Sequence, residues 1–281
     1  MTEIATAAGL TFTARAAGPE DGRPVLLLHG FPQTSRCWAT QLDALGAAGF
    51  RAVAFDQRGY SPGARPDDVA AYKPALLTDD VLQVADALGW ATFDLVAHDF
   101  GGMVAWMVAG HQPDRVRTLT VASTPHPAAF RTTYKEAGST DQSERSSYMR
   151  SFREAGRGDT EAAMLADGAA GLRGVYAGLE PDAADEYVAV LSQPGALVAA
   201  IDWYRSMSGA ASAATPASEV PTLYVWSDQD PTLGRAAAEA TADLVTGPYR
   251  FEVLEGVGHW IPELAAERLT PLLLEHLRQH A

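Results

Sequence analysis

Six short apolar runs, rich in Val and Leu, recur along the chain. They lie at residues 25–28, 52–55, 93–97, 116–121, 222–226 and 249–254. Each run ends in residues typical of turns, and most are followed by a segment with helical spacing. A strand without polar alternation is buried on both faces, as in a parallel sheet covered by helices. The sequence therefore predicts an α/β fold with a mostly parallel sheet and helices on both faces.

Three segments have the spacing of helices that pack one face against such a sheet. In residues 78–89 the apolar side chains fall on one stripe, with Thr78 as the expected cap and Gly89 as the stop. Further helices are expected at about residues 101–110 and 265–280. Their positions between and after the apolar runs fit a sheet that is covered on both sides.

The strand pattern breaks between residues 127 and 218. Here a polar stretch precedes Ala-rich segments of helical character, with no strand-like run between them. We therefore expect a core domain formed by residues 1–126 and 219–281, and a helical cap formed by residues 127–218 that acts as a lid over the sheet.

Charge and cysteine content narrow the classes of partner. The 281 residues include 21 Lys and Arg against 35 Asp and Glu, a formal net charge of −14 that would repel a phosphate backbone. The single cysteine, Cys37, cannot form an internal disulfide. No apolar stretch approaches the roughly 18 residues of a membrane helix, and the N-terminus lacks a basic start followed by an apolar run. These features predict a soluble, cytoplasmic protein without a nucleic-acid or membrane partner.

Residues Leu95–Gly102 join a buried apolar run to two glycines that begin a helix, with Asp99 at the junction. A sharp strand-to-helix turn strains the backbone of its central residue and requires small neighbours, here Ala97, Gly101 and Gly102. The segment predicts a nucleophile elbow with Asp99 at its tip. A helix-capping aspartate is the structural alternative.

The loop after the first apolar run, His29–Pro32, can aim a backbone N–H at this elbow. Together with the N–H of Phe100, which follows the candidate nucleophile, the N–H of Phe31 would form an oxyanion hole. We expect the His29 imidazole to hold the loop by hydrogen bonds rather than to take part in chemistry.

Two later loops carry a candidate acid and a candidate base. Residues 225–230 contain Asp228 and Asp230, and residues 254–260 contain His259 next to Gly258. An acid after one strand and a histidine after the next supply a base and the group that orients it, in the chain order nucleophile, acid, histidine. A loop histidine bonded only to the backbone is the structural alternative, and both aspartates are candidates for the acid.

Taken together, these segments resemble the α/β-hydrolase fold family over residues 11–277, and in particular its epoxide hydrolase and dehalogenase branch. The matching motifs are His29–Pro32, Asp56–Ser61, His98–Gly102, Pro125–Pro127 and Gly258–Trp260. Members of this branch use an aspartate, not a serine, as the nucleophile. A carboxylate displaces a leaving group at saturated carbon and becomes an alkyl ester. The resemblance implies Asp99 as nucleophile, His259 as base and Asp230, rather than Asp228, as the acid.

Within the branch, the resemblance favours epoxide hydrolases. Haloalkane dehalogenases usually hold halide with side-chain N–H groups at the positions of Phe31 and Phe100, and phenylalanine has none. Fluoroacetate dehalogenases carry arginines just after the nucleophile, where Asp99–Met103 has none. Epoxide hydrolases use two lid tyrosines to polarise the epoxide oxygen, and residues 147–156 and 202–205 resemble those motifs. The tyrosines implied are Tyr148 and Tyr204; either one alone could be a packing residue.

The sequence analysis thus predicts an epoxide hydrolase that forms a vicinal diol through a covalent aspartyl ester. The alternatives are a dehalogenase with the same three residues, and a non-catalytic ligand-binding protein on a hydrolase scaffold. No metal-binding or nucleotide-binding motif is present, so we expect no metal and no organic cofactor, only water as co-substrate. The physiological epoxide, the stereochemistry and the oligomeric state stay open.

Overall fold

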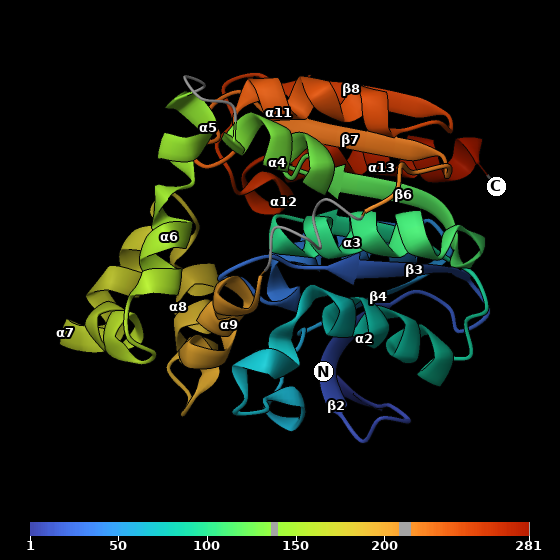
Figure 1. Ribbon diagram of the computed structural model, residues 1–281. Coiled ribbons are helices and arrows are strands. Elements are labelled where there is room, and N and C mark those ends of the chain that lie inside the picture. The colour runs from blue at the N-terminus through green and yellow to red at the C-terminus, as the bar shows by residue number, and fades with distance from the viewer. Residues whose placement is uncertain (136–139, 208–214, 281) are drawn as a thin grey trace.

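The computed structural model describes residues 1–135, 140–207 and 215–280. Its described strands form one sheet in the order β1-β2-β4-β3-β5-β6-β7-β8 (Figure 1). All six apolar runs are strands of this sheet, and they pair in parallel, so the predicted α/β fold is confirmed. The parallel strands are β3 (Arg23–Leu28), β4 (Phe50–Phe55), β5 (Phe93–His98), β6 (Val116–Ala122), β7 (Thr222–Ser227) and β8 (Tyr249–Leu254).

Two antiparallel strands at one edge of the sheet were not predicted. They are β1 (Thr2–Ala5) and β2 (Thr11–Ala17), and β2 pairs with β4. In β2 the buried Phe12 and Ala14 alternate with half-buried residues, because only one face of this edge packs against the core. A search for uninterrupted apolar runs misses such a strand; its signal is the alternation.

The helices around the sheet belong to two groups. Those outside the segment between β6 and β7 are α1 (Ala39–Ala47), α2 (Pro74–Ala87), α3 (Phe100–His111), α11 (Arg235–Ala240), α12 (Ile261–Leu264) and α13 (Ala266–Gln279). Those between β6 and β7 are α4 (Pro127–Lys135), α5 (Thr140–Arg145), α6 (Ser147–Glu154), α7 (Asp159–Val175), α8 (Pro181–Leu191) and α9 (Ala196–Ser206). Short 3₁₀ turns lie at η1 (Ser35–Trp38), η2 (Pro62–Ala64), η3 (Val69–Tyr72), η4 (Pro113–Arg115) and η5 (Thr241–Leu244).

Helix α2 begins one turn before the expected cap. Pro74 occupies its first turn, where the missing N–H costs nothing. The Thr78 hydroxyl donates to the Pro74 carbonyl oxygen at 3.0 Å inside the helix, so Thr78 is not the N-cap. Gly89, in the left-handed conformation at φ +75°, follows the end of the helix as expected.

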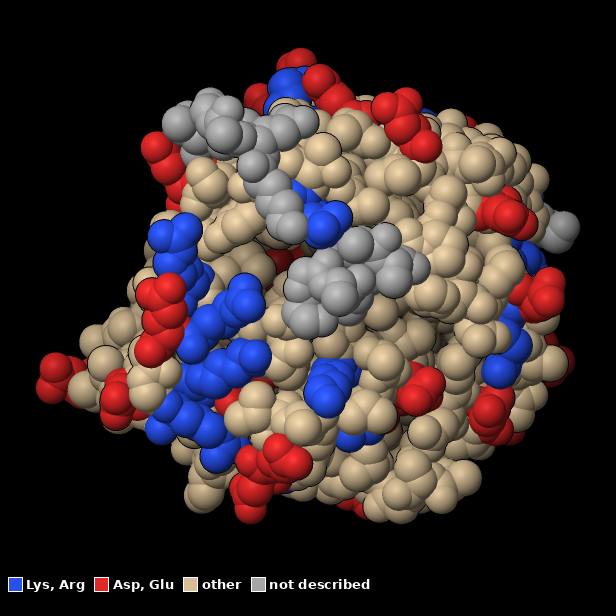
Figure 2. Space-filling model, viewed as in Figure 1, with Lys and Arg blue, Asp and Glu red and all other residues tan. Residues whose placement is uncertain are grey.

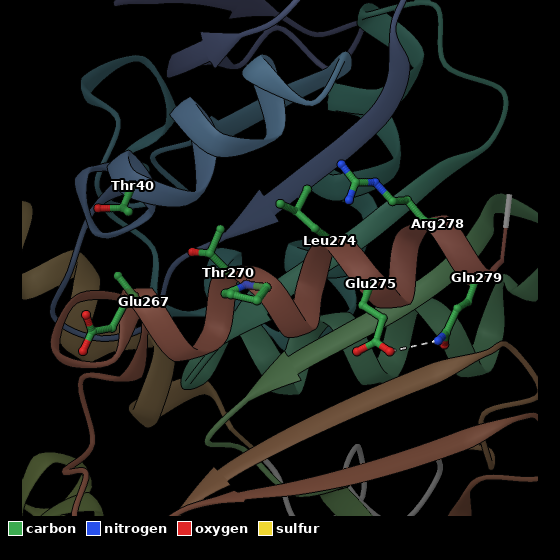
Figure 3. Close-up of a pocket in the computed structure, with 9 residues that line it drawn as sticks. Thr40, Glu267, Thr270, Leu274, Glu275, Arg278 and Gln279 are labelled. Atoms are coloured by element: carbon green, nitrogen blue, oxygen red, sulfur yellow. Dashed lines mark hydrogen bonds between the residues drawn. The ribbon is translucent and has the colours of Figure 1, made fainter.

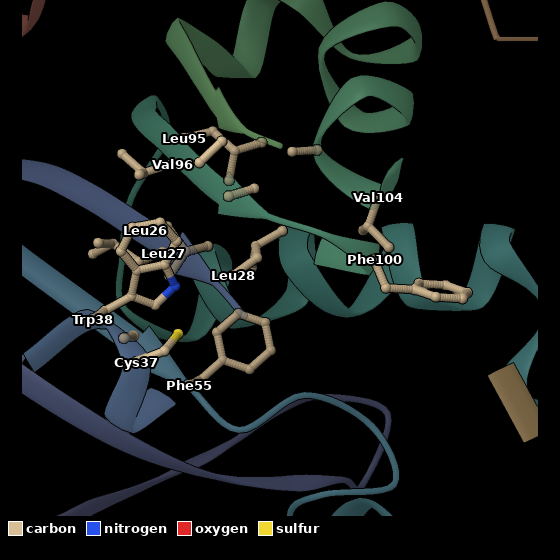
Figure 4. Packing of buried hydrophobic residues seen from close by; sticks show 14 of the residues in the cluster. Leu26, Leu27, Leu28, Cys37, Trp38, Phe55, Leu95, Val96, Phe100 and Val104 are labelled. Carbon is tan, nitrogen blue, oxygen red and sulfur yellow. The ribbon is translucent and has the colours of Figure 1, made fainter. Parts of the chain in front are cut away.

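The core lies on both sides of β3 and β5 (Figure 4). Leu26, Leu27 and Leu28 of β3 are fully buried, as is Leu95 of β5. Because β3 and β5 are parallel neighbours, with Leu28 paired to Ala97, their carboxyl ends meet at the same edge of the sheet. The loops that follow these two strands are therefore held side by side.

Helices α5 to α9 lie beyond this carboxyl edge of the sheet, while α2 and α3 cover one of its faces (Figure 1). On the side shown in Figure 2, basic side chains gather over this helical insertion, where α6 exposes Arg150 and Arg153. The net negative charge of the chain is thus unevenly distributed. Residues 136–139 and 208–214 of the expected cap lie outside the described residues. Among the helices of the described ranges, none is both long and apolar enough to cross a membrane.

Candidate active site

Asp99 occupies a strained turn between β5 and α3. Its backbone lies at φ +50° and ψ −124°, a conformation that non-glycine residues rarely adopt. A Cβ at Gly101 would lie 2.4 Å from the His29 carbonyl oxygen, so only glycine allows the helix to start this close to β3. Gly30 is equally constrained, because its Cβ would lie 2.3 Å from the Asp99 Cβ. The predicted elbow is present, with Asp99 at its tip.

Backbone N–H groups hold the Asp99 carboxylate. Phe31 donates its N–H to Oδ1 at 2.8 Å, and the N–H of Phe100 also forms a hydrogen bond with the carboxylate. These are the two amides expected to form an oxyanion hole. His29, as expected, holds the loop: its Nδ1 lies 2.9 Å from the Gly30 carbonyl oxygen, and its Nε2 accepts the N–H of Gln57 at 3.0 Å.

His259 lies between two carboxylates. Its Nδ1 is 2.7 Å from Asp230 Oδ2, and its Nε2 is 3.4 Å from Asp99 Oδ2. The other Asp230 oxygen, Oδ1, accepts the N–H groups of Thr232 at 2.7 Å and Leu233 at 3.0 Å. Asp230 is 1% exposed and its carboxylate is fully hydrogen-bonded, so it is fixed against one edge of the imidazole.

Asp228, the rival acid, lies elsewhere. Its Oδ1 accepts the N–H of Gly256 at 2.7 Å, and this hydrogen bond joins the loop after β7 to the loop after β8. It is half-buried, and the two carboxylates beside the His259 ring are those of Asp230 and Asp99. The structure therefore brings Asp99, His259 and Asp230 together and leaves Asp228 outside.

The charges in this group stabilise one another. Burial acts to lower the pKa of His259, but Asp230 and Asp99 outweigh it and raise that pKa to about 10. Burial acts to raise the pKa of Asp230, yet the charge and hydrogen bond of His259 bring it down to about 2. Burial also acts to raise the pKa of Asp99, but the hydrogen bond and the charge of His259 outweigh it, so this pKa is lowered. In the free protein at neutral pH, an imidazolium thus lies between two carboxylates.

This imidazolium predicts a loss of stability at alkaline pH. A raised histidine pKa contributes stability that is complete below the unfolded value of 6.5 and is lost as the pH rises toward about 10. We expect the free energy of unfolding, measured with denaturant, to fall more steeply across this range in the wild type than in His259→Gln. Parallel curves for the two proteins would show that His259 is not stabilised as a cation.

Tyr148 of α6 and Tyr204 of α9 face Asp99 from the helical insertion. Their rings pack edge to face with centroids 5.9 Å apart, and a hydrogen bond joins their side chains. Burial first, and then the charge of Asp99, raise the pKa of Tyr148; burial and the neighbouring Tyr148 raise that of Tyr204. Both hydroxyls therefore stay protonated and able to donate a hydrogen bond.

Two cavities meet at these three side chains. Asp99, Tyr148 and Tyr204 line both a cavity of about 480 Å³ and a smaller one of about 60 Å³. His259 and Trp260 line the larger, and the smaller is mostly apolar, with Phe100 and Met103 among the residues of its wall. The larger cavity has the size of a small-molecule site, and a small apolar molecule in it would lie against Asp99, Tyr148 and Tyr204.

Ser123 is a site residue that the sequence analysis missed. Its hydroxyl donates to Asp230 Oδ2 at 3.0 Å and lies 3.2 Å from His259 Nδ1. Its backbone has a positive φ of +75°, and Tyr224 donates to its carbonyl oxygen at 2.9 Å. No motif marks this serine, but its place directly after β6, at the same carboxyl edge as Asp99, was available from the strand pattern.

A larger hollow, of about 860 Å³, lies along α13 and contains none of these groups (Figure 3). Its wall includes Thr40, Glu267, Leu274 and Arg278. Within residues 1–135, 140–207 and 215–280, no three His, Cys, Asp or Glu side chains converge in a way that could hold a metal ion. The hollow along α13 therefore contains no part of the group formed by Asp99, His259 and Asp230.

Comparison with known proteins agrees with this geometry. The sequence pattern of the alpha/beta hydrolase fold matches residues 23–266, most of the chain. The chain belongs to the α/β-hydrolase family. It is 32% identical to the AB hydrolase superfamily protein YfhM of Bacillus subtilis, over 96% of this chain and 95% of that protein.

Its relatives within the α/β-hydrolases include epoxide hydrolases. Epoxide hydrolase A of Mycobacterium tuberculosis is 30% identical over 92% of this chain and 91% of its own length. The crystal structure of epoxide hydrolase A from Mycobacterium thermoresistibile superposes with a TM-score of 0.85 at 27% identity, covering 99% of this chain and 97% of that one. These similarities place this α/β-hydrolase in the epoxide hydrolase branch, as the sequence motifs implied, and make it a hydrolytic enzyme.

Proposed function

We propose that the protein hydrolyses small organic epoxides to vicinal diols through a covalent ester on Asp99. The observation that supports this most is that Asp99, Tyr148 and Tyr204 line the same two cavities. A nucleophile on one side and two protonated hydroxyls on the other suit a ring whose carbon is attacked while its oxygen leaves.

In the first half of the proposed reaction, Asp99 Oδ2 attacks an epoxide carbon, because Oδ1 is engaged with the Phe31 amide. The new bond joins Oδ2 to carbon, and the ring C–O bond breaks. Tyr148 and Tyr204 donate hydrogen bonds to the departing oxygen and lessen its charge. Esterification removes the negative charge of Asp99, so the pKa of His259 falls. The imidazolium then loses a proton and the alkoxide gains one.

In the second half, neutral His259 takes a proton from water, and the water oxygen attacks the Asp99 carboxyl carbon. Asp230 keeps the imidazole oriented, and the N–H groups of Phe31 and Phe100 hold the oxyanion. The tetrahedral species then expels the diol, which takes the second proton of the water and the original Oδ2. Asp99 returns as a carboxylate, and His259 as an imidazolium, ready for the next turnover.

The proposal includes the division of the chain into a core of residues 1–126 and 219–281 and a cap of residues 127–218. Support comes from α4 to α9, which interrupt the strand order between β6 and β7 and carry both tyrosines. The cytoplasmic location, and the lack of a cofactor, a nucleic-acid partner and a membrane partner, stay predictions from the sequence.

A substrate panel tests the reaction. We expect diol formation from styrene oxide-like epoxides and no halide release from haloalkanes or haloacids, because the aromatic side chains of Phe31 and Phe100 offer no N–H to a halide. Halide release without diol formation would contradict the proposal and favour the dehalogenase alternative.

The tyrosines provide a second test. Tyr148→Phe or Tyr204→Phe should each slow alkylation by about 10- to 10⁴-fold, the scale of positioned acid catalysis, and the double change should cost more. Single-turnover kinetics measure this step directly. Tyr249→Phe is the matched control, because the Tyr249 hydroxyl on β8 has no partner among the described residues and lines neither cavity. Wild-type alkylation rates in both single variants would show that neither tyrosine assists ring opening.

A further inference from the structure

A line of hydrogen-bonded side chains runs from helix α8 to the backbone of His259. Tyr187 donates its hydroxyl to Glu263 Oε1 at 2.6 Å, and Glu263 Oε2 lies 2.5 Å from Nε2 of Gln33. Gln33 Oε1 lies 2.9 Å from His98 Nδ1, and His98 Nε2 lies 2.9 Å from the carbonyl oxygen of His259. This line, which we call the Glu263 relay, joins the helical insertion to the loop of the proposed base.

All the hydrogen bonds of the relay can form together only if it holds one proton more than an ionised Glu263 and a neutral His98 would carry. The His259 carbonyl can only accept, so His98 Nε2 must carry its hydrogen. In a neutral imidazole Nδ1 is then an acceptor and requires the amide nitrogen of Gln33. The amide oxygen of Gln33 then faces Glu263, and only a protonated carboxyl can donate to it. With the amide turned the other way, His98 itself must hold two protons.

Two observations favour Glu263 over His98 as the site of the additional proton. Burial and the charge of His259 lower the pKa of His98 to about 4. Burial raises the pKa of Glu263 and outweighs the hydrogen bond from Tyr187, which acts to lower it.

We propose that Glu263 is a neutral carboxylic acid that positions the His259 loop through Gln33 and His98. Gln33 belongs to the loop that supplies the Phe31 amide, and His98 directly precedes Asp99. The additional proton therefore holds the loop of Phe31, the end of β5 before Asp99 and the loop of His259 in fixed positions relative to one another. Losing it leaves two acceptors facing each other at one step of the relay, whichever way the amide turns.

Charged and titratable groups surround both ends of the relay. Arg36 of η1 favours ionised Glu263, while Cys37 of the same turn interacts with the glutamate electrostatically. Tyr176, at the end of α7, also interacts with Glu263. At the other end, Asp99 and Asp230 act to raise the pKa of His98, and His259 acts to lower it. Arg36 is the positive charge that opposes a neutral Glu263, and its effect on the pKa is smaller than that of the hydrogen bond from Tyr187.

Spectroscopy of the intact protein locates the proton. The infrared difference between wild type and Glu263→Gln at neutral pH should show the carbonyl stretch of a protonated carboxylic acid in the wild type alone. Nitrogen-15 NMR should show His98 as the neutral tautomer with hydrogen on Nε2. A missing carboxylic-acid band, or an imidazolium at His98, would overturn the proposal. Neither readout involves turnover, so they separate this inference from the proposed function.

The kinetic consequence of the relay does rest on the proposed function. Glu263→Gln keeps an N–H donor toward Gln33 but has no proton to lose. We expect it to keep the wild-type rate at neutral pH and to show its alkaline fall in rate at a higher pH than the wild type, because only His259, with a pKa of about 10, then titrates. Glu263→Leu removes donor and acceptor together and should slow hydrolysis of the ester by up to about 10²-fold. An unchanged alkaline fall in Glu263→Gln, or full activity in Glu263→Leu, would contradict a positioning role.

Discussion

His259→Gln is expected to stop after about one turnover with its active site esterified. Opening the epoxide needs the Asp99 carboxylate and the two tyrosines, whereas breaking the ester needs an activated water. Glutamine cannot take the proton of that water, so the first half of the reaction proceeds and the second does not. Intact-protein mass measurement should show the variant heavier by one substrate mass, with the addition on the peptide that contains Asp99.

The matched control for this variant is His111→Gln. His111 ends α3 and is exposed, so its loss should leave turnover unchanged and leave no adduct. Accumulation of unmodified His259→Gln together with substrate that is not consumed would mean that His259 is required before the ester forms.

Asp99→Asn should lose about 10⁴- to 10⁶-fold in turnover, the scale seen when a nucleophile is removed. The neutral amide is a poor nucleophile, and its loss of charge also lowers the pKa of His259. Asp228→Asn is the matched control, because Asp228 lies outside the site and its carboxylate accepts a hydrogen bond from Gly256. We expect the control to keep its rate, measured as diol formed per enzyme. Comparable rates for Asp99→Asn and the wild type would show that Asp99 is not the nucleophile.

The parts of the fold that the sequence predicts are those governed by local chemistry. A strand buried on both faces is mostly apolar, so β3, β5 and β7 are visible as runs. A strained turn packed against a neighbouring strand must have glycine at Gly101, so the elbow is visible as a motif. In contrast, β2 faces the core on one side only, and its alternation is short.

The missed site residues depend on contacts between distant segments. Ser123 and Asp230 are 107 residues apart, and their hydrogen bond exists only because β6 and β7 are neighbours in the sheet. Glu263 and Gln33 are 230 residues apart, and neither lies in a motif of known chemistry. Their side chains are ordinary polar residues in the sequence. Only the order of the strands brings them beside His259.

A single turnover of the wild type in ¹⁸O-labelled water tests the covalent mechanism most directly. Because water attacks the Asp99 carboxyl carbon, the first diol should carry an unlabelled oxygen from the enzyme, and the label should remain in the Asp99 carboxylate. Mass analysis of the peptide that contains Asp99, and of the diol, measures both. Label in the first diol with an unlabelled Asp99 would mean that water attacks the epoxide itself, and would contradict Asp99 as the nucleophile.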